Sequence, residues 1–488
     1  MRGALPESDI QEIIARVRGR LVSHEGEARP AAAMKAAAAV ADGAVETGDG
    51  IFPTVDAAVS AAMRAYTYYH DMGLDVRHRV VEAIRASMRE HGERLAYEAR
   101  EETGLGRAAD KVVKNRLVTA KTPGPEDLDP QVVTGDSGMM ITEYAPYGVV
   151  GAITPTTNPT STIINNTIAI VSAGNAAVFN VHPNAKRVSA ENIRLINRAI
   201  VSAGGPENLV TAVGEPTIES AKAVMAHPDV RVLLVTGGPG VVKEAAATPK
   251  KAILAGPGNP PAVVDQTADV EAAGGHIVAG ASFDNNVICT DEKTTIVVDT
   301  VADRLVSAMV SSGAYRLKDH ELKRLERVIF REMGPPSKPG AINPEWIGKD
   351  AARIAAAAGI EVEDDVRLLV AEVPREHSLV WTEQMMPVMP VVRVTNVDDA
   401  ISLAVRSEHG FRHTASIHST NVETITRMGR AMNCSIFVAN ASNFAGLAHG
   451  GEGYASFSIA SPTGEGLTRP RTFSRVRRVT VVGAMRIV

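Results

Sequence analysis

Apolar segments of strand length alternate with helical patterns along this chain, and this alternation narrows the possible folds more than any other feature. Four segments are typical of buried strands: 146–154, 175–181, 209–213 and 230–236. Apolar residues at helical spacing lie between them, over 160–173, 184–203 and 217–226. Strands that alternate with helices predict a parallel, doubly wound α/β sheet. Such a sheet binds ligands at the carboxyl ends of its strands.

Further elements flank this region. Helical patterns over 55–72 and 76–102 precede it, and a second α/β region extends from about residue 260 to residue 455. Two segments with alternating polarity, 138–144 and 475–483, are predicted strands outside the main sheets. Strands in such positions commonly extend the sheet of a second subunit. We therefore expect a homo-oligomer, either a dimer or a tetramer.

Composition excludes several classes of function. The chain has 488 residues, a formal net charge of -5 and only 4% aromatic residues. This charge argues against a nucleic-acid or membrane-surface role. No apolar run reaches the roughly 18 residues needed to span a bilayer. Two cysteines in so long a chain indicate a reducing compartment, so we expect a cytoplasmic protein.

The N-terminal segment is predicted to form a short helix that a linker joins to the rest of the chain. Residues 8–21 predict a short amphipathic helix, with Ser8 and Gln11 in a capping-box pattern. The following residues, to Gly50, are rich in Ala, Gly and Glu and predict a linker. Two interpretations remain open: the helix docks on its own globular body, or it is a docking peptide for another protein.

Cys289 is the candidate nucleophile. It lies in 281–290 after an apolar Val-Ile step, and the only other cysteine, Cys434, is distant in sequence. The chain has no CxxC and no His/Cys metal spacing, so we expect no metal site. A free cysteine is more often a small buried hydrophobe than a catalytic group. The case for Cys289 therefore depends on the other motifs.

Four further segments carry candidate chemistry. Asn158, in the loop 154–159, can donate an amide N–H to a developing oxyanion. The glycine-rich turn 235–240 lets backbone approach a phosphate, although it is neither G-x-G-x-x-G nor a P-loop. Segment 254–261 offers flexible backbone donors, and Glu383 places one carboxylate before a predicted strand. Each segment alone is also compatible with an ordinary turn or surface loop.

Taken in order and spacing, these segments resemble the aldehyde dehydrogenase superfamily from about residue 51 to the end. The closer resemblance is to the CoA-acylating aldehyde dehydrogenases of bacterial microcompartments. It rests on the tethered helix and on motifs at 179–183, 285–290, 450–454 and 462–466.

The resemblance implies a fold and a set of domains. The fold is α/β, with a Rossmann-type cofactor domain, an α/β catalytic domain, a small β oligomerisation extension and a tethered N-terminal helix. The implied boundaries are 1–22 for the docking helix, 23–50 for the linker, 51–130 and 148–258 for dinucleotide binding, 259–455 for catalysis, and 131–147 and 456–488 for the oligomerisation strands.

The resemblance also implies residue roles. Cys289 matches the nucleophile and Asn158 the oxyanion-stabilising amide. The implied cofactor, NAD, would contact Thr154, Pro155, His182, Thr236, Gly237, Gly238 and Glu383. His182 stands where hydrolytic members carry a lysine near the adenosine ribose, so the choice between NAD and NADP stays open.

An absent carboxylate favours coenzyme A as the acyl acceptor. Hydrolytic members carry a water-activating Glu about 34 residues before the cysteine, which here is Ala255. Without that base, the acyl-enzyme should await a thiolate. We expect a small neutral aldehyde, acetaldehyde or propionaldehyde, and association with microcompartment shell or core proteins through residues 8–21. The alternatives are a hydrolytic enzyme with another base, an inactive docking homologue, and an NADPH-dependent acyl-phosphate reductase.

Overall fold

The computed structural model describes residues 45–486. The predicted helix over 8–21 and most of the predicted linker lie outside the described residues. The last residues of that linker bond to the folded body: the backbone N–H of Val45 donates to Glu215, and Arg198 pairs with Asp49 at 2.8 Å. The backbone of Gly50 accepts from the Ala212 N–H.

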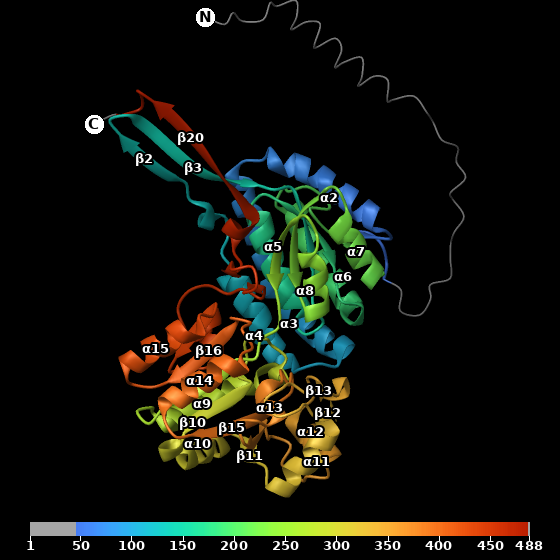
Figure 1. Cartoon of the computed structure of the whole chain (residues 1–488). Coiled ribbons are helices and arrows are strands. Elements are labelled where there is room, and N and C mark those ends of the chain that lie inside the picture. The colour runs from blue at the N-terminus through green and yellow to red at the C-terminus, as the bar shows by residue number, and fades with distance from the viewer. Residues whose placement is uncertain (1–44, 487–488) are drawn as a thin grey trace, which may run out of the picture. The chain divides into compact units, whose positions relative to one another are not determined.

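A six-stranded sheet forms the first α/β region (Figure 1). Its order is β1 (Ile51–Phe52), β6 (Val210–Val213), β5 (Ala176–Asn180), β4 (Val149–Ile153), β7 (Val230–Thr236) and β8 (Lys251–Ala255). All neighbouring strands are parallel, as the sequence predicts. The four predicted strands correspond to β4, β5, β6 and β7 within a few residues.

Helices pack against this sheet and against one another. They are α2 (Val55–His70), α3 (Leu74–Thr103), α4 (Ala108–Lys121), α5 (Pro159–Ser172), α6 (Lys186–Ser202), α7 (Ile218–Ala226) and α8 (Pro239–Ala246). Every residue of α5 is buried, because the helix lies between α3, α4 and α6. Its side chains therefore face protein on all sides, which fixes the loop that precedes it.

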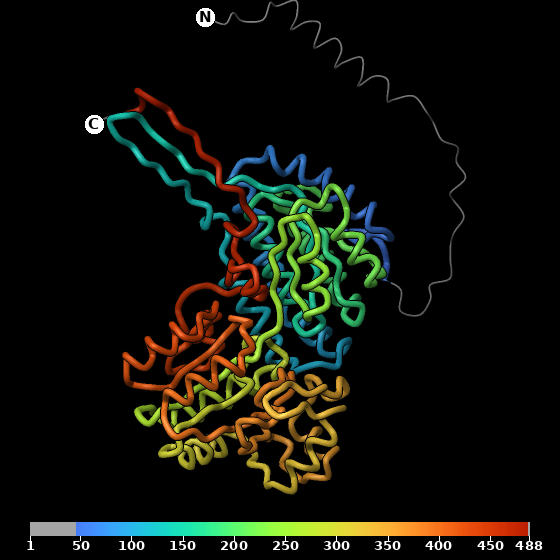
Figure 2. The backbone as a smooth tube through the Cα atoms, viewed as in Figure 1, coloured from blue at the N-terminus to red at the C-terminus, as the bar shows by residue number. Residues whose placement is uncertain are grey.

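A seven-stranded parallel sheet forms the second α/β region. Its order is β11 (Ala314–Arg316), β14 (Leu368–Glu372), β15 (Val388–Val394), β10 (Thr294–Val298), β9 (Pro261–Val264), β16 (Thr414–His418) and β17 (Ile436–Ala439). Its helices are α9 (Val270–Ala281), α10 (Asp299–Ser311), α11 (Asp319–Ile329), α12 (Ala351–Ala357), α13 (Ser378–Trp381), α14 (Val397–Ser407) and α15 (Val422–Met432). Figure 2 shows the chain passing from the first sheet to the second after β8.

Three strands form a separate antiparallel sheet, β2 (Gln131–Gly135), β3 (Gly138–Pro146) and β20 (Ser474–Val482). The two strands predicted outside the main sheets therefore pair with each other, in a register that sets Val479 opposite Ile141. The sequence did not indicate β2. Five valines on this sheet are more than half exposed: Val132, Val133, Val476, Val479 and Val482.

Short elements complete the described chain. Two antiparallel pairs are β12 (Phe330–Glu332) with β13 (Ala341–Ile342), and β18 (Ile459–Ala460) with β19 (Gly466–Leu467). Short 3-10 turns include Phe283–Asn286 and Asn443–Leu447. No helix within residues 45–486 is long and apolar enough to cross a membrane.

Two adjacent glycines of α9 should respond oppositely to alanine. A Cβ at Gly274 would lie 2.6 Å from the Ala308 Cβ of α10, whereas one at Gly275 would meet only Ser312 Oγ, at 3.7 Å. Gly274→Ala should lower the free energy of unfolding by about 1–3 kcal/mol through overpacking. Gly275→Ala should raise it by about 0.5–1 kcal/mol, since glycine weakens a helix. Urea unfolding midpoints measure both, and shifts of the same sign would contradict this packing.

Candidate active site

One cavity of about 600 Å³ lies where the two α/β regions face each other. Its walls come from the carboxyl ends of β4, β5, β7 and β8 and from the loop that precedes β10. This edge of the first sheet is the one at which parallel sheets bind ligands. All nine residues predicted from the sequence line it: Thr154, Pro155, Asn158, His182, Thr236, Gly237, Gly238, Cys289 and Glu383.

Asn158 occupies the position before α5, at the end of the loop that follows β4. Its side chain makes no capping bond to the helix. Instead the Oδ1 atom accepts a hydrogen bond from Lys114 Nζ at 2.6 Å, and the Nδ2 atom donates to Thr157 Oγ1 at 3.1 Å. Lys114 thus engages the carbonyl oxygen and Thr157 engages one amide N–H, which leaves the second N–H of Nδ2 for the cavity.

The loop that carries Cys289 has an unusual backbone. Asp284, Asn285 and Asn286 have φ values of 45°, 56° and 65°, all in the left-handed region. Non-glycine residues there cost of order 1–3 kcal/mol each, so the surroundings must hold them. Asn285 donates to Gly348 O and to Asp350, and Asn286 donates to the carbonyls of Ala281 and Glu292.

Asp284 is the most strongly held residue of this loop. Its carboxylate, which is completely buried, pairs with Lys111 at 2.9 Å and with Lys114, both from α4. It also accepts from the backbone N–H of Arg107 at 2.6 Å. Lys114 therefore bonds to Asp284, five positions before the cysteine, and to the candidate oxyanion donor Asn158.

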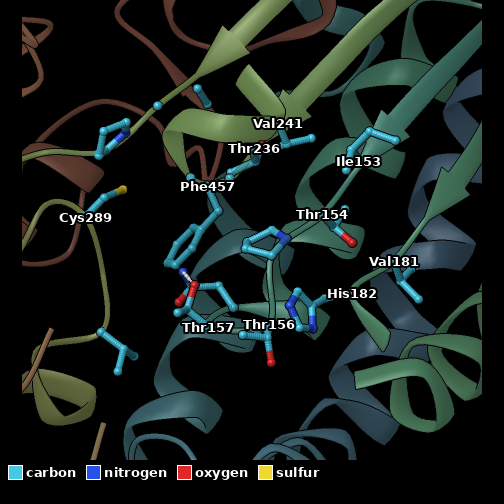
Figure 3. Close-up of a pocket in the computed structure, with 18 of the residues that line it drawn as sticks. Ile153, Thr154, Thr156, Thr157, Val181, His182, Thr236, Val241, Cys289 and Phe457 are labelled. Atoms are coloured by element: carbon cyan, nitrogen blue, oxygen red, sulfur yellow. Dashed lines mark hydrogen bonds between the residues drawn. The ribbon is translucent and has the colours of Figure 1, made fainter. Parts of the chain in front are cut away.

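Cys289 is half-buried and lines the cavity. Burial raises the pKa of its thiol to about 12, and the negative charge of Glu383 adds to that effect, whereas Lys293 opposes it. In the protein alone Cys289 is therefore a thiol at neutral pH. Its Sγ lies toward one end of the group of residues drawn in Figure 3, with His182 toward the other and Phe457 between them.

Glu383 contributes the only carboxylate among the described residues that line the cavity. Burial raises its pKa, and the Lys293 ammonium and the backbone of Gly258 partly offset this. Lys293 is itself buried, and its Nζ donates to the carbonyls of Asn286 and Ile288 and to Asn286 Oδ1. This lysine stabilises the cysteine loop from within.

The other end of the cavity suits a dinucleotide. Thr154 Oγ1 and Thr156 Oγ1 are buried without a hydrogen-bond partner in the described structure, so hydroxyls are free for a ligand. Gly237 and Gly238 precede α8, and a Cβ at Gly238 would meet nothing within 4 Å. Backbone can thus approach a pyrophosphate at a helix N-terminus. The volume falls in the range for cofactor pockets, roughly 300–1,000 Å³.

Ala255 lies in the wall of this cavity, at the carboxyl end of β8 beside Thr236. The backbone that follows Ala255 passes close to Cys289. A Cβ at Gly258 would lie 2.7 Å from the Cys289 carbonyl oxygen. A glycine is therefore required at position 258 for the backbone to pass so close. The structure places a methyl group where the resemblance predicts a water-activating carboxylate in hydrolytic enzymes.

Sequence reasoning missed three residues of the site. Phe457 lines the cavity and lies in an irregular segment between the motifs at 450–454 and 462–466, outside both of them. Lys114 and Asp284 came together only through folding, because they are 170 positions apart. A signal for the lysine existed: Lys111, Lys114 and Val118 share one stripe of α4 at helical spacing, and a charge on a buried stripe needs a partner.

Comparison with known proteins agrees with the predicted resemblance. The chain matches the Aldehyde dehydrogenase family over residues 45–321 and 367–465. It is 48% identical over 440 residues to an acetylating acetaldehyde dehydrogenase of Salmonella typhimurium, covering 90% of this chain and 94% of that protein. The chain therefore belongs to the aldehyde dehydrogenase family.

Two solved structures are similar over most of the chain. A Rhodopseudomonas palustris propionaldehyde dehydrogenase with bound CoA and an acylated cysteine has a TM-score of 0.87 and 46% identity, covering 91% of this chain and 100% of that one. A propionaldehyde dehydrogenase from the fucose utilisation microcompartment of Clostridium phytofermentans has a TM-score of 0.87 and 41% identity, covering 90% and 100%. Both agree with the predicted α/β fold.

The acidity of Cys289 can be tested by alkylation. Because its pKa is about 12, the thiolate fraction should rise with pH, and the iodoacetamide rate should climb without a plateau up to pH 10. An unperturbed cysteine would level off above its pKa of about 8.5. In a Cys434→Ala background, Cys289 is the only cysteine that can react with iodoacetamide. A plateau below pH 9 in the cofactor-free protein would contradict the buried, neutral thiol.

Proposed function

We propose that this protein is an NAD-dependent, CoA-acylating aldehyde dehydrogenase that converts a small aldehyde to its acyl-CoA. One observation carries the proposal: a half-buried cysteine and an oriented amide line a cavity in which Ala255 stands in place of a water-activating carboxylate. The acetylating relative and the structure with bound CoA and an acylated cysteine support the acceptor.

Each step can be assigned to named atoms. Cys289 Sγ gives its proton to solvent and bonds to the aldehyde carbon, and the π electrons of the carbonyl move to its oxygen, which becomes an oxyanion. Asn158 Nδ2 donates to this oxyanion, with the backbone N–H of Cys289 as a second donor. When bound, NAD⁺ would accept the hydride that leaves the former aldehyde carbon. The oxyanion then collapses to a carbonyl, and the acyl group stays on Cys289 as a thioester. The thiolate of CoA then attacks the thioester carbon, the acyl group leaves as acyl-CoA, and Cys289 Sγ departs as thiolate.

The cavity favours NAD over NADP. No lysine or arginine is among the described residues that line it. His182, at the end assigned to the adenosine ribose, has a pKa lowered by burial, so its imidazole is neutral at pH 7. A 2′-phosphate generally requires a cation such as arginine nearby. The hydroxyls of a plain ribose need no such partner.

The aldehyde should be small and uncharged. The cysteine shares the cavity wall with four apolar residues, Val287, Ile288, Leu447 and Phe457. Within residues 45–486, the lining includes no lysine or arginine to bind a substrate carboxylate. Acetaldehyde and propionaldehyde both meet these conditions. The relatives named above carry these two substrates in their names, which supports the same class here.

Each part of the chain has a proposed role. We assign dinucleotide binding to residues 51–130 and 148–258 and covalent catalysis to 259–455. Strands within 131–147 and 456–488 are proposed to join a second copy, since five valines of β2 and β20 are more than half exposed. Residues 457 and 459 also line the cavity, so the last segment contributes to the site as well.

The decisive test is NADH formation from propionaldehyde and NAD⁺, with and without CoA. Steady-state turnover should require CoA and give propionyl-CoA. Asn158→Ala should lower kcat by about 10²–10³-fold, the usual effect of losing one oxyanion donor. Cys289→Ala should show no turnover but still bind NAD⁺. Sustained NADH production without CoA, with free propionate as product, would show a hydrolytic enzyme instead.

We further propose that the protein works in the cytoplasm within a bacterial microcompartment, docked through residues 8–21. The similar structure from a fucose utilisation microcompartment supports this location. Deletion of residues 1–22 should leave kcat unchanged and abolish co-sedimentation with shell particles. A truncated protein that loses its activity would instead indicate that the segment docks on its own globular body.

A further inference from the structure

Lys114 makes an unusual bridge beneath the cavity. Its side chain is 1% exposed, and its Nζ donates to Asn158 Oδ1 at 2.6 Å and to the carboxylate of Asp284. The lysine therefore contacts both the candidate oxyanion donor and the loop that carries the nucleophile. It is not among the residues that line the cavity, and its hydrogen bonds to groups of the site go to these two neighbours.

An asparagine side chain can stabilise an oxyanion in only one orientation. Its two ends are nearly equal in shape, and a rotation by half a turn would point the carbonyl oxygen at the developing negative charge. An ammonium group has donors and no acceptor, so it can bond to the oxygen and not to the amide nitrogen. A buried ammonium beside Asn158 thus selects the orientation that presents Nδ2 to the substrate.

The same bond should strengthen the donor. A charged donor on Oδ1 draws electron density from the amide, and hydrogen bonds in series polarise one another in a medium of low dielectric. The surroundings are of that kind, because Lys114, Asp284 and Asn158 are all at most 7% exposed.

We propose that Lys114 is a positioning residue for the oxyanion step: it fixes the amide of Asn158 with its N–H toward the substrate carbonyl. This inference rests on the proposed function for the identity of the substrate. It assigns to Lys114 an effect on the transition state that Lys111 does not share.

Lys111 provides the matched control. It lies on the same helix, is equally buried, and pairs with the same carboxylate of Asp284, at 2.9 Å. Its other hydrogen bond goes to the Thr157 carbonyl at 3.2 Å and not to the Asn158 side chain. Removal of either lysine leaves Asp284 paired with the other. Substitution of either lysine thus removes one buried positive charge, but only substitution of Lys114 removes a hydrogen bond to the Asn158 amide.

The experiment compares Lys114→Met with Lys111→Met in the full chain. The readout is the single-turnover rate of NADH formation from propionaldehyde and NAD⁺ without CoA, which reports formation of the acyl-enzyme. Lys114→Met should slow this step on the order of 10²-fold, as loss of an oxyanion donor does, with the same affinity for NAD⁺. Lys111→Met should slow it far less. Cys289 alkylation rates in both variants report whether the loop itself has moved.

A double variant separates positioning from a merely structural role. If Lys114 acts through Asn158, Lys114→Met should add little in an Asn158→Ala background, and the two effects should not multiply. Equal rates for the two lysine variants, or multiplying effects in the double variant, would overturn the inference. Where a methionine variant does not fold, the leucine variants of the same two positions give the same comparison. Because the step precedes acyl transfer, a wild-type protein that releases free acid refutes the acylating function and leaves this comparison intact.

Discussion

The buried carboxylate of Asp284 is the interaction on which the site depends. Two lysines of α4 and the backbone N–H of Arg107 converge on it from the first α/β region, while its own backbone belongs to the cysteine loop of the second. A buried carboxylate is stable only when it is paired and hydrogen-bonded, so its position is strongly determined. The left-handed backbone of residues 284–286 is tolerated because this anchor and the amide bonds of the two asparagines hold it.

Burial also sets the chemistry of the nucleophile. Burial of the thiol and the charge of Glu383 raise the pKa of Cys289, the candidate nucleophile, so the sulfur remains a thiol until the reactants enter. A neutral thiol is a poor nucleophile, which protects the cysteine from side reactions. Ala255 has a related effect, because a methyl group cannot activate water. Under the proposed function, the site combines a cysteine that stays protonated until reactants bind with an acyl-enzyme that needs a thiolate acceptor.

Much of the fold could be predicted from local patterns. Period and length located β4 to β7 and the helices between them, because the strands are buried and largely apolar and the helices carry apolar residues at helical spacing. The predicted strand over 230–236 matches β7 from end to end. Strand β2 was missed, since its residues are exposed and its pairing with β3 depends on contacts across a tight turn. Helix α4 was missed because its buried stripe includes lysines, which read as solvent-facing residues.

In the site, too, features within one loop could be predicted from the sequence, whereas contacts between distant positions could not. Three motifs could be predicted because each lies within a single loop, around residues 158, 237 and 289. All three line one cavity. The Lys114–Asp284 contact could not be predicted, because it joins positions 170 apart: Asp284 lies in the cysteine segment, but Lys114 lies in no motif. Sequence alone offers candidate groups, whereas the electrostatic support that orients them depends on tertiary structure.

The most direct test is to observe the covalent intermediate. The protein should be incubated with propionaldehyde and NAD⁺ without CoA, then analysed by intact-mass spectrometry and peptide mapping. The account predicts one propionyl group per chain, located on Cys289, that persists in water and is released as propionyl-CoA when CoA is added. A propionyl group on another residue, or rapid loss to free propionate without CoA, would contradict it.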